Sequence, residues 1–190
     1  MQRSLAKKQQ PLPLYANGEA WLADKKNWKT LAKKPFEHTP LAYLKSILLQ
    51  DIASGYPIKV SVGTDSQQWG DTLKFATAII VHKEGRGSRG LYTKWQTGEL
   101  SLYQKLLLET QSSIYCAWGI GTLVNSLGLE VEIHLDINPK DTEKSYVAMK
   151  ECLGYVLGMG YIGILKPDAT TTRCADHLLK TGKGYLPSDN

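Results

Sequence analysis

The sequence predicts an α/β fold: a five-stranded mixed sheet, with three antiparallel strands followed by parallel crossovers, flanked by helices. The first observation is a run of three strand-like stretches, about residues 58–65, 74–82 and 91–96, joined by polar turns that contain glycine. The second is the later alternation of strand-like with helical stretches, which is typical of crossover connections. With 190 residues, the chain is long enough to bury a sizeable core.

The composition is that of a soluble globular protein, with 42% hydrophobic and 22% charged residues. No stretch approaches the roughly 18 apolar residues that span a bilayer, and no signal segment opens the chain, so we expect a cytoplasmic protein. The cysteines, Cys116, Cys152 and Cys174, lack the paired spacing of a zinc site, and their odd number argues against a disulfide framework. We expect them to be buried and reduced.

Positive charge is concentrated in the N-terminal segment, which we interpret as a basic arm over residues 1–37. Its first 35 residues carry eight Lys and Arg against two acids, a net charge of +6, so the rest of the +5 chain sums to −1. Trp21 and Trp28, seven residues apart, would share one face of a short helix and could stack on bases while lysines neutralise phosphates. The alternative is that these tryptophans dock on the protein's own domain. The expected contacts with a nucleic acid, RNA or DNA, are Lys25, Lys26, Trp28 and Lys29, with Arg86 and Arg89.

The folded domain is predicted over residues 38–182, and residues 183–190 are predicted to form a flexible tail. Its first helix has clear boundary signals, because Thr39 can cap it, Pro40 suits the first helical position and Gly55 suits the end. Leucines recur between these boundaries at helical spacing.

A strand follows from Ile58 and leads through Gly63 into Asp65. We interpret the polar run over residues 66–71 as a hairpin turn, and the glycine-rich run over residues 85–90 as a second one. The glycine-rich run lacks the GK[ST] ending and the following helix of a phosphate loop. An acid at the end of a core strand costs several kcal/mol unless it is paired or metal-bound, so Asp65 is either a ligand or a turn-forming residue.

A long helix is predicted over residues 100–127, and one glutamate lies on its apolar side. A solvated Glu109 should fall on the opposite side of such a helix. Either Glu109 faces the sheet and needs a cationic partner, or it pairs with a nearby lysine such as Lys105 at the edge of the stripe. The stripe consists of Leu102, Leu106, Glu109, Ser113, Cys116 and Ile120.

The clearest strand of the chain spans residues 129–138, where apolar and polar residues alternate and Asp136 is the terminal carboxylate. Asp141 or Thr142 can cap a helix that runs to about residue 157. A short fifth strand at residues 161–165 and a final helix at about residues 169–180 complete the domain, and Asp176 lies in that helix.

Four acids therefore fall in the first strand, the first long helix, the fourth strand and the last helix: Asp65, Glu109, Asp136 and Asp176. This layout resembles the ribonuclease H-like superfamily, whose active site is assembled from those four places. Local matches at residues 63–67, 132–138, 158–160, 166–167 and 173–178 are similar to the YkuK-like family of uncharacterised bacterial ribonuclease H-like proteins. The resemblance covers about residues 38–182.

Carboxylates that converge on one site cannot all stay ionised without added positive charge. Mg²⁺ or Mn²⁺ supplies it, and two ions about 4 Å apart can activate a water and stabilise a leaving oxygen. The resemblance implies a metal-dependent nuclease with the four acids as catalytic residues and metal ligands. The resemblance also implies that Asp65 bridges both ions, that Asp176 helps hold the ion that activates water, and that Glu109 and Asp136 hold the other ion. Our hypothesis for its substrate is RNA, an RNA/DNA hybrid or branched DNA.

Several alternatives stay open at this point. Asp168 competes with Asp176 for the fourth position, and Glu132 shares the polar face of its strand with Asp136. His134 and Lys166 are further candidates, as a proton shuttle or a phosphate contact, although His134 also suits a strand surface. A non-catalytic nucleic-acid-binding protein with the same fold is the alternative function. An actin-like phosphotransferase fits less well, because those proteins use two such domains.

Overall fold

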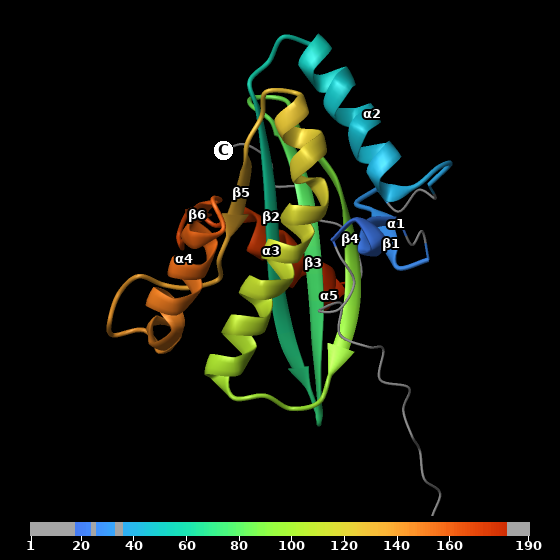
Figure 1. The fold of residues 1–190 in the computed structure, drawn as a ribbon. Coiled ribbons are helices and arrows are strands. Elements are labelled where there is room, and N and C mark those ends of the chain that lie inside the picture. Colours follow the sequence, from blue (N-terminus) through green and yellow to red (C-terminus); the bar gives the residue numbers. More distant parts are fainter. Residues whose placement is uncertain (1–17, 24–25, 33–35, 182–190) are drawn as a thin grey trace, which may run out of the picture.

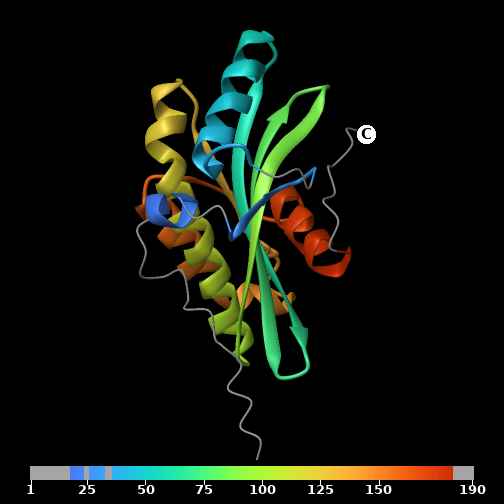
Figure 2. The same ribbon diagram turned by 90° about the vertical axis from the view of Figure 1, so that its right-hand side faces the viewer.

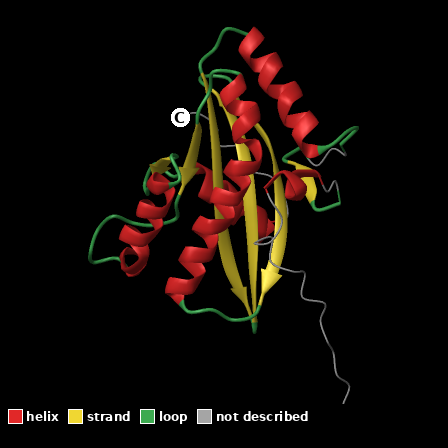
Figure 3. Ribbon diagram, viewed as in Figure 1, coloured by secondary structure: helices red, strands yellow, loops and turns green. Residues whose placement is uncertain are grey.

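The computed structural model describes residues 18–23, 26–32 and 36–181, which form one mixed sheet with helices on both faces (Figures 1 and 3). Within these residues the sheet has six strands in the order β1-β4-β3-β2-β5-β6. The strands are β1 (Trp28–Thr30), β2 (Ile58–Trp69), β3 (Thr72–Lys83), β4 (Gly87–Thr97), β5 (Val131–His134) and β6 (Ile162–Ile164). The helices are α1 (Gly18–Ala23), α2 (Pro40–Ala53), α3 (Leu102–Ser126), the 3₁₀ helix η2 (Lys144–Ala148), α4 (Met149–Gly158) and α5 (Thr170–Thr181).

The strand directions agree with the order that the sequence predicts. β2, β3 and β4 form an antiparallel meander; β5 pairs in parallel with β2, and β6 pairs in parallel with β5, both through helical crossovers. The number of strands was predicted wrongly, because β1 adds a sixth strand antiparallel to β4. β1 is only three residues long, and a run this short carries too little periodicity to be told from a helix.

The prediction of one basic helix carrying both Trp21 and Trp28 is wrong, because α1 ends at Ala23 and Trp28 begins β1. Both tryptophans are buried, and the indole Nε1 of Trp28 donates to the Trp21 carbonyl at 2.9 Å. Their ring centroids are 5.4 Å apart. The alternative therefore holds: these tryptophans dock on the domain itself. Residues 1–17 of the predicted arm, Lys25 and the predicted tail over residues 183–190 lie outside the described residues.

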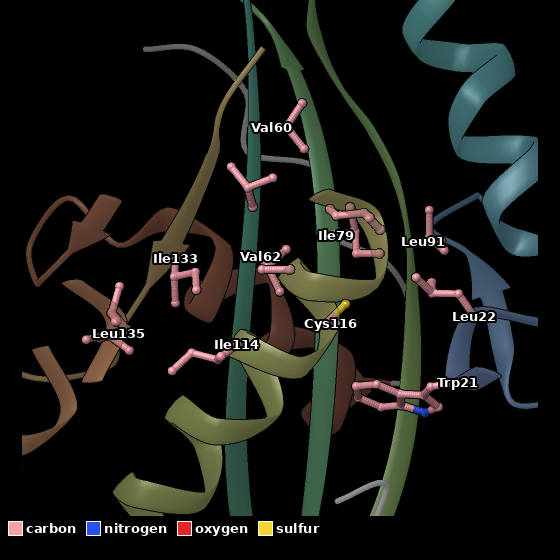
Figure 4. Close-up of a cluster of buried hydrophobic side chains, with 14 of the residues drawn as sticks. Trp21, Leu22, Val60, Val62, Ile79, Leu91, Ile114, Cys116, Ile133 and Leu135 are labelled. Carbon is pink, nitrogen blue, oxygen red and sulfur yellow. The ribbon is translucent and has the colours of Figure 1, made fainter. Parts of the chain in front are cut away.

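Alternate residues of β2 face the two helical layers, which lie on opposite sides of the sheet in Figure 2. Val60 and Val62 belong to the main core, together with Ile114 and Cys116 of α3 (Figure 4). Their neighbours on the strand face α5, as the hydrogen bond of 2.6 Å between the hydroxyls of Ser61 and Thr171 indicates. Burial on both faces explains why the middle of β2 has no exposed residue.

Several element boundaries differ from the predicted ones. β2 continues through the polar residues to Trp69, and the hairpin turn contains only Gly70 and Asp71, with Gly70 at a φ of 57°. Residues 66–69 look like a turn by composition, but their backbones pair with β3. The helix expected to start at Asp141 or Thr142 begins later, because η2 precedes α4.

The three cysteines are buried and free, as predicted. In the ranges described above, none of the helices is long and apolar enough to cross a membrane.

Candidate metal centre

The sheet opens beside Asp65. β5 pairs with β2 over four residues, and the last pair joins Gly63 to His134. After that pair the chain of β5 leans toward β6, where the Leu135 amide donates to the Ile164 carbonyl at 2.8 Å. Asp65 and Asp136 each lie two residues beyond the last pair. Both carboxylates therefore belong to the face that Gly63 and His134 turn toward α5.

Asp65 is buried, with 7% of its surface exposed, in the middle of β2 rather than at its end. Its Oδ1 accepts a hydrogen bond of 2.7 Å from the Ser66 amide. The pKa of Asp65 is raised from 3.8 to about 7, chiefly by burial and then by the charges of Asp136 and Asp176, while Lys105 and the Ser66 amide act in the opposite direction. Asp65 is thus the point where the acids of different elements interact.

Glu109 reaches this region from α3 and is 4% exposed. Its Oε1 accepts a hydrogen bond of 2.7 Å from the Ser66 hydroxyl, and the Lys105 Nζ lies 3.5 Å away, one turn earlier on the helix. Burial raises the pKa of Glu109 to about 8, with the charge of Asp65 as the next cause. The two readings of Glu109 left open by the sequence both hold, because it faces the sheet and also pairs with Lys105.

The other two acids are less buried and carry partners of their own. Asp136 Oδ1 lies 2.8 Å from the Nζ of Lys166. Asp176 accepts a hydrogen bond of 2.6 Å from the Gln67 side-chain amide on β2 and lies 2.6 Å from the Nζ of Lys180. Gln67 therefore connects β2 directly to the acid of α5.

Asp176, not Asp168, is the acid near α5 that faces Asp65, Glu109 and Asp136. These four acids are here called the acidic cluster. Asp176 contributes to the raised pKa of Asp65, whereas Asp168 is exposed in the turn before α5. Glu132 stays within its strand, where its carboxylate lies 3.3 Å from the His134 Nε2.

The start of α5 is fixed tightly against β2 and β5. A Cβ added at Gly63 would lie 3.0 Å from the Thr172 amide nitrogen and 3.1 Å from the Thr171 Cβ, so any other residue here would require the start of α5 to move away by a few tenths of an ångström. The Thr171 amide donates to His134 Nδ1 at 3.0 Å and thereby satisfies one of the unpaired N–H groups at the start of the helix. These contacts determine where the later residues of α5, including Asp176, lie.

His134 is buried, so the expectation of a strand-surface histidine is wrong. Because Nδ1 accepts from the Thr171 amide, the proton lies on Nε2, which faces the Glu132 carboxylate. Burial lowers the pKa of His134, and the hydrogen bond to Glu132 acts in the opposite direction. The neutral ring is thus a structural support for α5, and sequence periodicity alone gave no signal for this role.

Two functional contacts were missed from the sequence: Ser66 as the donor to Glu109 and Gln67 as the donor to Asp176. Both lie in the run that composition assigns to a turn. The signal that could have found them is the alternation of β2, which continues past Asp65 and sends Ser66 toward α3 and Gln67 toward α5.

The donor chemistry of the cluster fits a hard divalent cation, since all four groups are carboxylates. In the conformation seen here, however, no group of three His, Cys, Asp or Glu side chains among the described residues is arranged to hold a metal ion. Three of the acids have a lysine ammonium as their cation instead: Lys105 for Glu109, Lys166 for Asp136 and Lys180 for Asp176.

The residues predicted to contact a nucleic acid differ in their exposure to solvent and in whether their charge is already paired. Trp28 is 2% exposed, so it cannot stack on a base in this fold, which corrects that prediction. The Arg89 guanidinium lies 2.6 Å from the buried Asp51 carboxylate and anchors α2, so its charge is already compensated. Lys26 and Lys29 are exposed, and the exposed Arg86 lies over the Tyr56 ring.

Sequence comparison agrees with the fold. A sequence model of the ribonuclease H-like family matches residues 42–180, a span that contains all four acids. This chain belongs to the ribonuclease H-like family. It is also similar to the uncharacterized protein YkuK of Bacillus subtilis (strain 168), with 33% identity over 143 residues, which cover 67% of this chain and 81% of that protein.

Proposed function

We propose that this ribonuclease H-like protein is a divalent-metal-dependent nuclease that hydrolyses phosphodiester bonds in RNA, an RNA/DNA hybrid or branched DNA. The observation that carries the proposal is the meeting of Asp65, Glu109, Asp136 and Asp176 from separate elements. Burial and the charges of Asp136 and Asp176 together raise the pKa of Asp65 to about 7. Like charges held this close, in a partly buried place, favour a bound cation.

The lysines of the cluster do not prevent metal binding. The side chains of Lys166 and Asp136 are 41% and 24% exposed. An ion pair of this kind contributes only about 0–1 kcal/mol, so a divalent cation can displace the ammonium at little cost. Lys105 is more enclosed, with 24% of its side chain exposed, and it remains beside Glu109 as a fixed positive charge.

Mg²⁺ or Mn²⁺, as a pair of ions, would supply an activated water and stabilise the leaving oxygen. Asp65, Glu109, Asp136 and Asp176 would hold the ions. The protein's own hydrogen bonds orient two of these acids in advance: the Ser66 hydroxyl holds Glu109, and the Gln67 amide holds Asp176. Such support keeps carboxylates near their working geometry.

The proposal is tested by incubating the protein with Mg²⁺ or Mn²⁺ and labelled substrates of each kind: single-stranded RNA, an RNA/DNA hybrid and a four-way DNA junction. We expect cleavage of at least one substrate, lost in EDTA and lost in the Asp65→Asn variant. Asp168→Asn is the matched control, because Asp168 is an exposed acid in the turn before α5 and does not contribute to the raised pKa of Asp65. Cleavage that survives Asp65→Asn would contradict the proposal.

A second candidate is a non-catalytic nucleic-acid-binding protein with the same fold. It is favoured by the pairing of three acids with lysines, which compensates part of the negative charge without a metal. In that case binding should fall steeply with salt, should not depend on divalent metal, and should be unaccompanied by cleavage.

A further inference from the structure

One end of the sheet is left open by α5, on the same face as Asp65. α5 crosses this face and packs Cys174, Ala175 and Leu178 against alanines and an aromatic ring of β3 and β4. The hairpin of β2 and β3 extends beyond the helix, as Figure 2 shows. The residues that the strand registers place on this part of the face, here called the hairpin face, are Gln67, Trp69, Thr72, Lys74 and Gln96.

The hairpin face carries an exposed tryptophan beside a cation. Trp69 is 51% exposed, and the Nζ of Lys74 lies 4.5 Å from the centroid of its ring. The other side of the same strands differs, since Leu73 and Phe75 are buried there in the main core. Trp69 therefore does not fill the core, and its ring is available to solvent beside the Lys74 ammonium.

The hairpin face is continuous with the acidic cluster. Trp69 is four residues from Asp65 on the same side of β2, a distance of about 14 Å along an extended strand. Gln67 lies between them and donates its amide hydrogen bond to Asp176. Lys74 stands opposite Gln67, and Gln96 stands opposite Lys74.

We propose that the hairpin face binds a single strand of nucleic acid and guides it into the acidic cluster, an inference that rests on the nuclease function proposed above. A base stacks on Trp69, and Lys74 contacts a phosphate, which is the combination of aromatic platform and positive charge that single strands require. A cation is needed here because the neighbouring acids repel phosphates. A paired duplex keeps its bases stacked inside and offers them poorly to Trp69.

The test measures the binding of a fluorescently labelled single-stranded oligonucleotide by anisotropy, in EDTA so that nothing is cleaved. Trp69→Ala should weaken binding about 10-fold, and Trp69→Phe should restore most of the loss, because a stacked base contributes about this much. Trp118→Ala is the matched control: Trp118 is 56% exposed on α3, across the sheet from the hairpin face, and its loss should have no effect.

The contribution of the Lys74 charge is tested separately, through the dependence of the binding affinity on salt concentration. Lys74→Gln should reduce the slope of log affinity against log salt by about 0.7, the value for one phosphate contact on a single strand. Lys150→Gln, at an exposed lysine of α4, should leave the slope unchanged. Circular dichroism of each variant checks that the fold is retained.

Binding by Trp69→Ala equal to that of the wild type would overturn the inference, as would equal losses for Trp69→Ala and Trp118→Ala. Failure of the nuclease proposal gives a different pattern. If Trp69 matters for binding but no metal-dependent cleavage is found, the hairpin face stands as a binding surface and the nuclease proposal fails. If Asp65-dependent cleavage is found and Trp69 has no effect on binding, the inference fails alone.

Discussion

Asp65 of β2 and Asp136, which follows the end of β5, each lie two residues beyond the last pair of the β2–β5 ladder, Gly63 and His134. The strand that precedes each acid is fixed by apolar packing. This placement brings two like charges to the same face of the sheet, beside the acid of α5. The charge of Asp136 is, after burial, the largest cause of the raised pKa of Asp65.

The raised pKa of Asp65 predicts how the stability of the metal-free protein depends on pH. The folded state binds this proton more tightly than the unfolded state, so the stability it contributes is fully present below pH 3.8 and is lost as the pH rises toward 7. Asp65→Asn, which cannot ionise, should therefore gain stability relative to the wild type across that window. Urea unfolding in EDTA at several pH values measures the difference. A difference that does not change with pH would contradict this prediction.

Metal binding should have the opposite dependence on pH. Asp65 and Glu109, with pKa values of about 7 and 8, must lose protons before they can act as ligands. We expect Mn²⁺ to raise the melting temperature more at pH 8 than at pH 6, and to have no such effect on Asp65→Asn. A metal that binds only the native state stabilises it by about 2.7 kcal/mol at 100 times its Kd. If Mn²⁺ raised the melting temperature of the wild type and of Asp65→Asn equally, the metal would bind at another site.

Gly63→Ala should destabilise the protein by about 1–3 kcal/mol, because the added Cβ meets the backbone of α5 rather than the end of a flexible side chain. The same change should displace Asp176 and weaken metal binding. Gly154→Ala in α4 is the control, since its Cβ would meet nothing within 4 Å and alanine favours a helix. Urea unfolding compares the two, and an unchanged stability of Gly63→Ala would show that α5 can shift freely.

His134→Ala should cost about 1–3 kcal/mol of stability, because the buried Thr171 amide loses its acceptor. Asn can place an oxygen near the position of Nδ1, so His134→Asn should recover part of the loss. The exposed His38 provides a control, and His38→Ala should have little effect. If His134→Ala instead left stability intact and abolished only cleavage, the structural role assigned to His134 would be wrong.

Much of the fold could be predicted because, in long segments, the spacing of apolar residues distinguishes a helix from a strand. The stripe of α3 indicated a buried Glu109, and the alternation before Asp136 indicated a strand. β1 could not be predicted, since three residues show no period and only pairing with β4 makes them a strand. Tertiary pairing also turned the polar residues after Asp65 into strand.

The four acids of the candidate site could be named from the sequence, but their arrangement in space could not be predicted. Sequence position cannot distinguish Asp168 from Asp176, because the choice depends on how close Gly63 allows α5 to approach β2. The lysine partner of Asp136 was equally hidden, whereas Lys105 was named from the sequence as a possible partner of Glu109. Lys166 and Asp136 are thirty residues apart in the sequence, and only the parallel pairing of β5 with β6 brings their segments together.

The most direct test of the proposed metal centre is a crystal structure of the protein soaked in Mn²⁺, with the anomalous signal used to locate the ions. We expect two ions among Asp65, Glu109, Asp136 and Asp176, with the ammonium groups of Lys166 and Lys180 moved away from their carboxylates. Crystals that contain Mn²⁺ but show no ion at Asp65, with the lysine pairs unchanged, would contradict this expectation.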